Sequence, residues 1–225
     1  MRHVLALLRK DLQLEFRSGA QILPLLTVSI LLVSFLGLGI GALVTEEELR
    51  RELFHPILWS VFILTGSMSL LRVFEADRGA KTLSACFIFD ISATAFYLSK
   101  VLFVSALLFG NTVFSSLLLA ALLDVSLLSH WHSLLVLLGV VTIGYSALGC
   151  FLAGLVLEHQ HRQILFPLIL LPLLFPLFFG VIEVSLVIFT ASGLLSVGGW
   201  FSLIIALTTT YLLIGVSLFE IVARN

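Results

Sequence analysis

The chain has 225 residues, of which 60% are hydrophobic and 11% are charged, and its mean hydropathy is +1.19. Soluble domains carry about 25% charged residues, and a soluble fold of this size could not bury so much apolar surface. The apolar runs are continuous and roughly 20 residues long, which indicates spanning helices rather than barrel strands of alternating polarity. The net charge of −1 carries no nucleic-acid signal. We therefore predict an all-α membrane protein forming one domain over residues 1–225.

The first predicted element is an amphipathic helix within residues 1–21. Its hydrophobic side chains recur at helical spacing, at Leu5, Leu8, Leu12 and Phe16. Such a helix lies in the membrane interface with its apolar side toward the acyl chains, or docks on the rest of the protein.

Six spans are predicted after this helix. They cover residues 22–44, 55–73, 97–123, 133–157, 164–182 and 200–219. Residues 45–54 read as a charged loop and residues 183–199 as an amphiphilic connection. Of the 12 Lys and Arg residues, only Arg50 and Arg51 fall on the side opposite the N-terminus. The positive-inside rule therefore predicts that both termini are cytoplasmic.

One cytoplasmic connection is long and contains both charged and apolar residues. Residues 74–96 are too charged to span and too apolar for a simple loop. A short helix with apolar anchors and charges is suited to docking in a groove on a partner, since the apolar face supplies affinity and the charges fix the register. The alternative is a surface helix without a partner. The candidate contact residues are Arg72, Phe74, Glu75, Asp77, Gly79, Leu83, Phe87 and Lys100.

The spans contain few groups that react. No Gly-x-x-x-x-Gly-Lys-Ser/Thr loop and no dinucleotide-binding glycine pattern occurs, so we do not expect the chain to bind ATP by those means. No predicted span has an ionisable group near its centre, and Lys100 lies near a helix end where its side chain can snorkel. A polar cluster within the third span is predicted to bond between helices, with a substrate pathway as the alternative. It consists of Asn111, Thr112, Ser115 and Ser116.

Two motifs resemble catalytic or metal-binding sites, but their positions in the predicted topology do not suit such sites. We therefore predict no catalytic residue and no metal site. Residues 46–51 fit the Glu-Glu-x-x-x-Arg pattern of CAAX-type intramembrane proteases, but they lie in an outer loop, and the spans offer no suitable set of histidine and aromatic partners. His130 and His132 flank Trp131, yet residues two apart do not share a helical face. Anchoring at the membrane interface is the prediction for this motif.

The fifth span carries Pro167, Pro172 and Pro176. A proline inside a helix removes a backbone hydrogen bond and kinks the helix. The spacing predicts either a fixed bend or a hinge in this span.

The order of elements resembles that of ABC-2 (type V) exporter permeases. A narrower resemblance is to the haem exporter protein B family, CcmB, of cytochrome c maturation. It rests on residues 9–17, 56–59, 74–83 with Lys100, 142–149 and 162–176. Residues 84–90 depart from the Leu-Leu-Leu-Ser-Pro run usual in that family, and beyond about residue 180 only the hydrophobic character matches.

The resemblance implies a non-catalytic permease subunit in a bacterial inner membrane, with no cofactor bound directly. Residues 74–96 would be its coupling helix on a separate ATPase subunit resembling CcmA, which would hydrolyse ATP. The implied partners also include subunits resembling CcmC and CcmD, the haem chaperone CcmE and a second permease copy. The complex would handle haem and release the loaded chaperone. A general ABC-2 exporter of lipid, polysaccharide or drug, and an intramembrane enzyme, remain alternatives.

Overall fold

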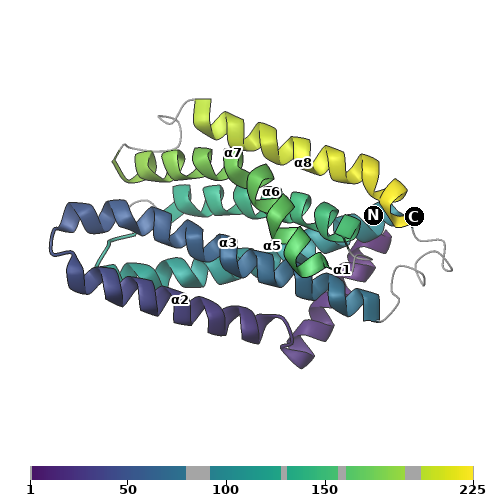
Figure 1. The fold of residues 1–225 in the computed structure, drawn as a ribbon, viewed down its shortest axis with the longest axis horizontal. Helices are drawn as coiled ribbons and strands as arrows, with labels where there is room; N and C mark the ends of the chain where they lie inside the picture. The colour runs from purple at the N-terminus through teal and green to yellow at the C-terminus, as the bar shows by residue number, and fades with distance from the viewer. Residues whose placement is uncertain (1, 80–91, 128–130, 157–160, 191–198, 225) are drawn as a thin grey trace.

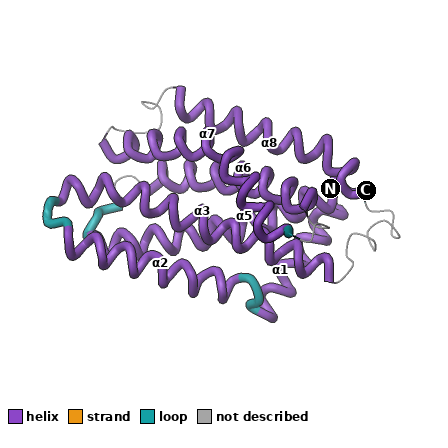
Figure 2. Tube along the Cα trace, in the orientation of Figure 1, coloured by secondary structure: helices purple, strands orange, loops and turns teal. Residues whose placement is uncertain are grey.

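The computed structural model describes residues 2–79, 92–127, 131–156, 161–190 and 199–224 (Figure 1). Within these ranges the chain forms helices joined by short loops (Figure 2). The helices are α1 (Arg2–Ser18), α2 (Ile22–Leu43), α3 (Glu47–Gly79), α5 (Ala93–Leu123), α6 (Trp131–Val156), α7 (Arg162–Thr190) and α8 (Gly199–Arg224). All of them except α1 are long and apolar enough to cross a membrane. The predicted all-α architecture with six spans is confirmed.

The helix α3 is longer than the predicted second span at both ends. It begins at Glu47 rather than at residue 55, so most of the predicted loop 45–54 is helical. Glu47 and Glu48 lie in its first turn, where the helix dipole favours negative charge, and Arg51 pairs with Glu47 one turn later. At the other end α3 continues to Gly79, so residues 74–79 prolong the span instead of starting a separate helix.

The helix α5 begins earlier than predicted, at Ala93 rather than at residue 97. Ser92 caps it, because its extended backbone lets Oγ accept a hydrogen bond of 3.3 Å from the backbone N–H of Ala95. Residues 93–96 therefore belong to the span and not to the predicted coupling segment. The middle of that segment, including Leu83 and Phe87, lies outside the described residues.

The helix α7 continues to Thr190, so the predicted connection beginning at Glu183 was placed too early. The apolar sequence persists through Ile188, and Glu183 is half-buried within the helix. In Figure 1, α7 changes direction along its length, and the half that begins at Arg162 runs at an angle to the rest. The prolines Pro167, Pro172 and Pro176 all lie inside this helix, which accounts for the bend.

The helices α5 and α6 form the centre of the bundle. The helix α6 packs against α3, α5, α7 and α8, whereas α5 also contacts α1 and α2. Glycines permit two of these close approaches: a Cβ at Gly149 of α6 would overlap Leu70 of α3, and one at Gly215 of α8 would overlap the Tyr97 ring of α5. The Tyr97 hydroxyl donates a hydrogen bond of 3.0 Å to the Ala147 carbonyl of α6.

Candidate functional site

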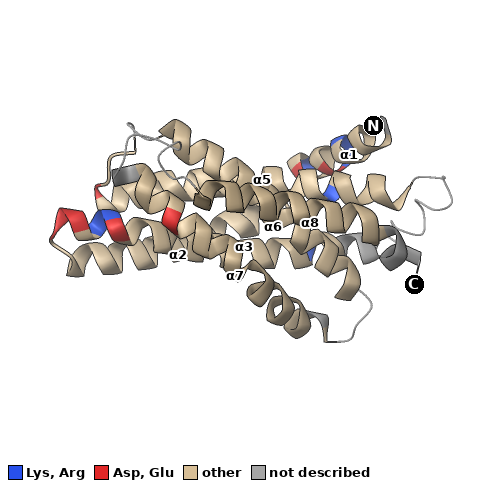
Figure 3. Cartoon of the chain, turned by 90° about the horizontal axis from the view of Figure 1, so that it is seen from above, with Lys and Arg blue, Asp and Glu red and all other residues tan. Residues whose placement is uncertain are grey.

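One end of the bundle gathers the elements that the sequence singled out. Both termini lie at this end, together with α1, the last turns of α3 and the first turns of α5 (Figure 1). We call residues 2–18, 70–79 and 93–100 the N/C end. Charged residues of the described chain lie mainly toward this end and the opposite one (Figure 3). The N/C end is therefore the first place to look for a functional contact.

The helix α1 docks on the bundle through a face that sequence patterning did not identify. Leu8 and Leu12 pack against the hydrophobic core, but Asp11 and Glu15 on the same face are the buried residues, with 7% and 4% of their surface exposed. These positions follow the i, i+3, i+4, i+7 spacing of a single helical face. Leu5 and Phe16, predicted to share the apolar stripe, point outward. The helix is thus docked and also presents apolar side chains to its surroundings.

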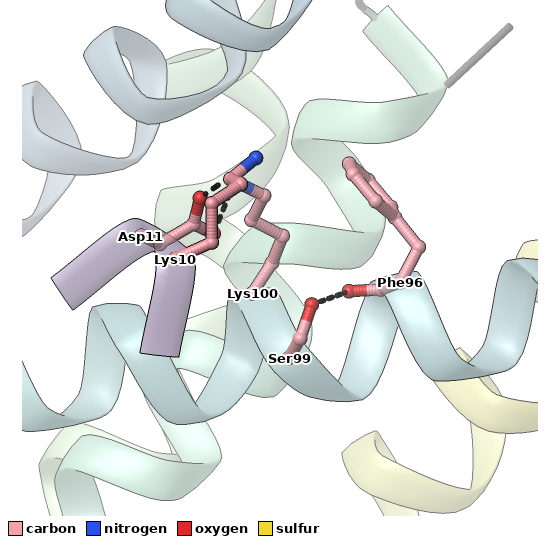
Figure 4. Close-up of polar contacts among 5 residues, drawn as sticks. All are labelled: Lys10, Asp11, Phe96, Ser99 and Lys100. Carbon is pink, nitrogen blue, oxygen red and sulfur yellow. Dashed lines mark hydrogen bonds and ion pairs between the residues drawn. The ribbon is translucent and has the colours of Figure 1, made fainter. Parts of the chain in front are cut away.

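A buried ion pair fastens α1 to α5 (Figure 4). Lys100 Nζ lies 2.7 Å from Asp11 Oδ2, and Lys10 Nζ lies 3.2 Å from Asp11 Oδ1. The Lys100 ammonium also lies 5.4 Å from the ring centroid of Phe96 and 5.9 Å from that of Phe103, within cation–π range. The Lys100 side chain is only 4% exposed. The expectation that Lys100 snorkels to the interface is therefore wrong, because a carboxylate from another helix neutralises it inside the bundle.

Glu15 fixes the turn from α1 into α2. Its Oε1 accepts hydrogen bonds from the backbone N–H groups of Gln21, at 2.8 Å, and Ile22, at 2.6 Å. These N–H groups have no acceptor within their own helix. The positive end of the α2 dipole also stabilises a carboxylate at this position. Gly19, with φ of +61°, makes the reversal between the helices. An acid shortly before a predicted helix start was the sequence signal for this cap.

The predicted partner-contacting residues have different surroundings. Phe74 is buried, with 2% of its surface exposed, and Lys100 is buried against Asp11. Arg72 is half-buried and lines a narrow crevice between α2 and α3. Glu75, Asp77 and Gly79 lie in the last two turns of α3, whereas Leu83 and Phe87 lie outside the described residues. Partner contact through the end of α3 stays a prediction.

The polar cluster of α5 is used mainly for packing between and within helices. Ser29 Oγ of α2 donates a hydrogen bond of 2.9 Å to Asn111 Oδ1, an interhelical bond of the predicted kind. Thr112 Oγ1 instead donates to the Leu108 carbonyl of its own helix, at 2.6 Å. Ser115 is buried. The Ser29–Asn111 bond thus joins α2 to α5, and a substrate pathway along this cluster stays a prediction.

The other side chains considered from the sequence lie apart from the N/C end. Within the described residues, no group of three or more His, Cys, Asp and Glu side chains is placed to hold a metal ion. Trp131 and His132 line a hollow near Asp124, at the junction of α5 and α6. Glu47 and Arg51 pair with each other on an exposed helix surface.

Six apolar helices and a docked amphipathic helix indicate a multi-pass membrane protein. The family model described as CcmB protein matches residues 2–223, so the chain belongs to the CcmB family. The match confirms the predicted resemblance and extends past residue 180, where only hydrophobic character was expected. Membership makes the chain a membrane component of the ABC transporter system of haem export and cytochrome c maturation. No curated protein matches the sequence.

Proposed function

We propose that this chain is the transmission subunit of its transporter, coupling ATP hydrolysis by a separate CcmA-like ATPase to movement of the spans. In the assembled complex this movement releases a haem-loaded chaperone resembling CcmE. The chain binds no cofactor directly in this proposal: ATP belongs to the partner ATPase, and the complex handles haem. Family membership supports the setting, and the geometry of α3 supports the mechanical role.

The continuity of α3 is the observation that carries the proposal. The helix has 33 residues, which makes it about 50 Å long at about 1.5 Å per residue. The hydrocarbon core of a bilayer is about 30 Å thick, so a helix of this length projects beyond it. Its apolar span ends at Phe74, and the charged turns up to Gly79 continue the same helix. Residues 57–79 contain no proline, so a push on the projecting end passes along an unbroken run of helix as far as Pro56, near the other end of α3.

The neighbouring helices complete the proposed lever. The Asp11–Lys100 pair makes α1 and α5 move together, since separating them would take the Asp11 carboxylate away from the buried Lys100 ammonium. The prolines Pro167, Pro172 and Pro176 remove backbone hydrogen bonds from α7, and we propose that this helix flexes there. The helix α3 has one internal proline, Pro56, and α7 has three; the two helices pack against each other and against α6.

The proposal also specifies the membrane, the orientation of the chain and its partner subunits. The chain would lie in a bacterial inner membrane with the N/C end in the cytoplasm, where an ATPase is found. The assembly would contain a second permease copy and subunits resembling CcmC and CcmD. The bias of Lys and Arg toward the N-terminal side supports this orientation.

Charge reversal at the end of α3 tests the coupling. In the purified complex, Glu75→Lys combined with Asp77→Lys is expected to abolish the dependence of ATPase rate on the permease, because the docking charges change sign. The matched control is Glu48→Lys combined with Glu52→Lys, which makes the same charge change at the other end of α3. Thermal unfolding of each variant should match that of the parent. Full coupling in the Glu75 and Asp77 variant would refute the lever.

Purification in mild detergent distinguishes this function from the general exporter. We expect an ATPase and a haem-handling membrane subunit to copurify with the chain. An ATPase without any haem-handling subunit would instead favour export of lipid, polysaccharide or drug. Recovery of the chain without an ATPase, under conditions that preserve its fold, would contradict both transporter functions.

A further inference from the structure

An apolar groove runs along the side of the bundle where α1 meets α2 and α5. Its volume is about 450 Å³, within the range of about 300–1,000 Å³ typical of ligand pockets. Leu12 and Phe16 line it from α1, Leu26 from α2, and Leu107 and Phe114 from α5. Three helices therefore surround a space that none of them fills.

A glycine keeps this groove open. Gly110 of α5 lines it, and a Cβ built there would meet no atom within 4 Å. Phe114, one turn further along α5, is 41% exposed, and Phe16 on the opposite wall is 80% exposed. A space of this kind on a membrane-facing surface fits a flexible hydrocarbon chain better than a polar ligand.

A second hollow lies beside the groove at the end of α1. Gln13 and Arg17 line it together with Phe16, which also lines the groove. Arg17 is exposed in the last turn of α1, and a guanidinium donates paired hydrogen bonds to phosphate oxygens. The one acid lining the groove, Glu15, already accepts two backbone N–H bonds from the start of α2. The two hollows share Phe16 as a wall, so the Arg17 guanidinium lies beside the apolar groove.

We infer that this paired site binds an anionic phospholipid from the leaflet in which α1 lies. One acyl chain fills the groove between α1, α2 and α5, and the phosphate contacts Arg17 and Gln13. The positive charge of Arg17 favours an anionic headgroup. The concave groove buries more of the acyl chain than a convex helix surface does, which distinguishes this lipid from the surrounding ones. The bound lipid would stiffen the junction that the Asp11–Lys100 pair also holds.

Lipid retention tests the site. The purified protein is equilibrated with mixed micelles containing equal amounts of phosphatidylglycerol and phosphatidylcholine and then delipidated, and retained lipid is counted by native mass spectrometry. The parent protein should retain phosphatidylglycerol about fivefold in excess, the preference that one basic residue supplies at an anionic surface. Equal retention of the two lipids would overturn the inference.

Two variants separate the two parts of the site. Gly110→Phe fills the groove and should lower retention of both lipids about tenfold or more, because the acyl chain loses its buried contacts. Gly139→Phe on α6 is the matched control, since a Cβ there also meets no atom within 4 Å and Gly139 does not line the groove. Arg17→Gln should keep acyl-chain binding but remove the headgroup preference. Unchanged retention in folded Gly110→Phe protein, or unchanged preference in Arg17→Gln protein, would contradict the site.

Discussion

Asp11 and Lys100 lie 89 residues apart in the sequence but share a hydrogen bond of 2.7 Å. Both side chains are almost fully buried. Removing an ion from water costs several kcal/mol, and a well-placed opposite charge offsets that cost. The pair is therefore more informative about where α1 must dock than about how stable the protein is.

Removing one member of this pair should be more damaging than removing both. We expect Lys100→Met to lower the free energy of unfolding by about 3 kcal/mol, because the buried Asp11 carboxylate then keeps only the partly exposed Lys10 ammonium, 3.2 Å away, as a counter-charge. The double variant Asp11→Leu with Lys100→Met should recover most of that loss. Denaturant titration in detergent, followed by Trp fluorescence, measures both. Equal losses in the single and double variants would mean that the charges are not coupled.

At the scale of one helix, α7 combines a high content of proline with an uninterrupted helical path. Pro172 and Pro176 are exposed on the bundle surface, so their side chains contribute little packing. Each proline in a helix interior costs about 3 kcal/mol relative to alanine. Retaining them on an exposed face indicates that the shape of α7 matters more than its local stability.

Replacing these prolines should stabilise the protein and impair its action. Pro172→Ala combined with Pro176→Ala is expected to raise the melting temperature, since backbone hydrogen bonds are restored without loss of core contacts. Permease-dependent ATPase activity of the complex should fall in the same variant. A lower melting temperature would show that neighbouring helices impose the bend on α7 and that the prolines only accommodate it.

The contact of α8 with α5 depends on the absence of a side chain at Gly215. Gly215→Ala should destabilise the protein by about 1–3 kcal/mol, because the new methyl group overlaps the Tyr97 ring. Gly39→Ala on α2 is the control: nothing lies within 4 Å of a Cβ there, and alanine is the better helix former. Thermal unfolding of the two variants gives the comparison. A Gly215→Ala protein as stable as the control would place Tyr97 elsewhere.

For the molecule as a whole, the distribution of basic residues predicts the orientation. A single cysteine at Glu46, in the loop between α2 and α3, should react with a membrane-impermeant maleimide in intact cells. A single cysteine at Arg9 should react only after the membrane is opened. Both variants are made in a chain whose native cysteines are replaced by serine. The reverse labelling pattern would place the N/C end outside the cytoplasm.

Hydrophobic run length was sufficient to predict the six spans, because helices in lipid must satisfy their own backbone. Helix ends were predicted less well. The acids at Glu47 and Glu48 and the cap at Ser92 extend helices through polar sequence that hydropathy treats as loop. Capping and dipole effects depend on single residues, and the mean hydropathy of a segment does not detect them.

The contacts at the N/C end could not be predicted from local pattern. The hydrophobic pattern of α1 does not include Asp11 and Glu15, although their spacing from Leu8 and Leu12 puts all four on one face. Which face is buried depends on the Lys100 ammonium and the start of α2, and these belong to distant parts of the chain. Residue types identified α1 as a segment of interest, whereas its contacts with α5 and α2 determine which face of α1 is buried.

The distance in sequence between Asp11 and Lys100 also bears on biosynthesis. When α1 leaves the ribosome, the helix that neutralises Asp11 has not yet been made. Docking of α1 at that moment would bury the Asp11 carboxylate with only Lys10 beside it, so we expect α1 to rest at the membrane surface until α5 has been inserted. The ion pair then closes a loop of 89 residues around α2 and α3. We therefore expect the docking of α1 to follow the insertion of α2, α3 and α5.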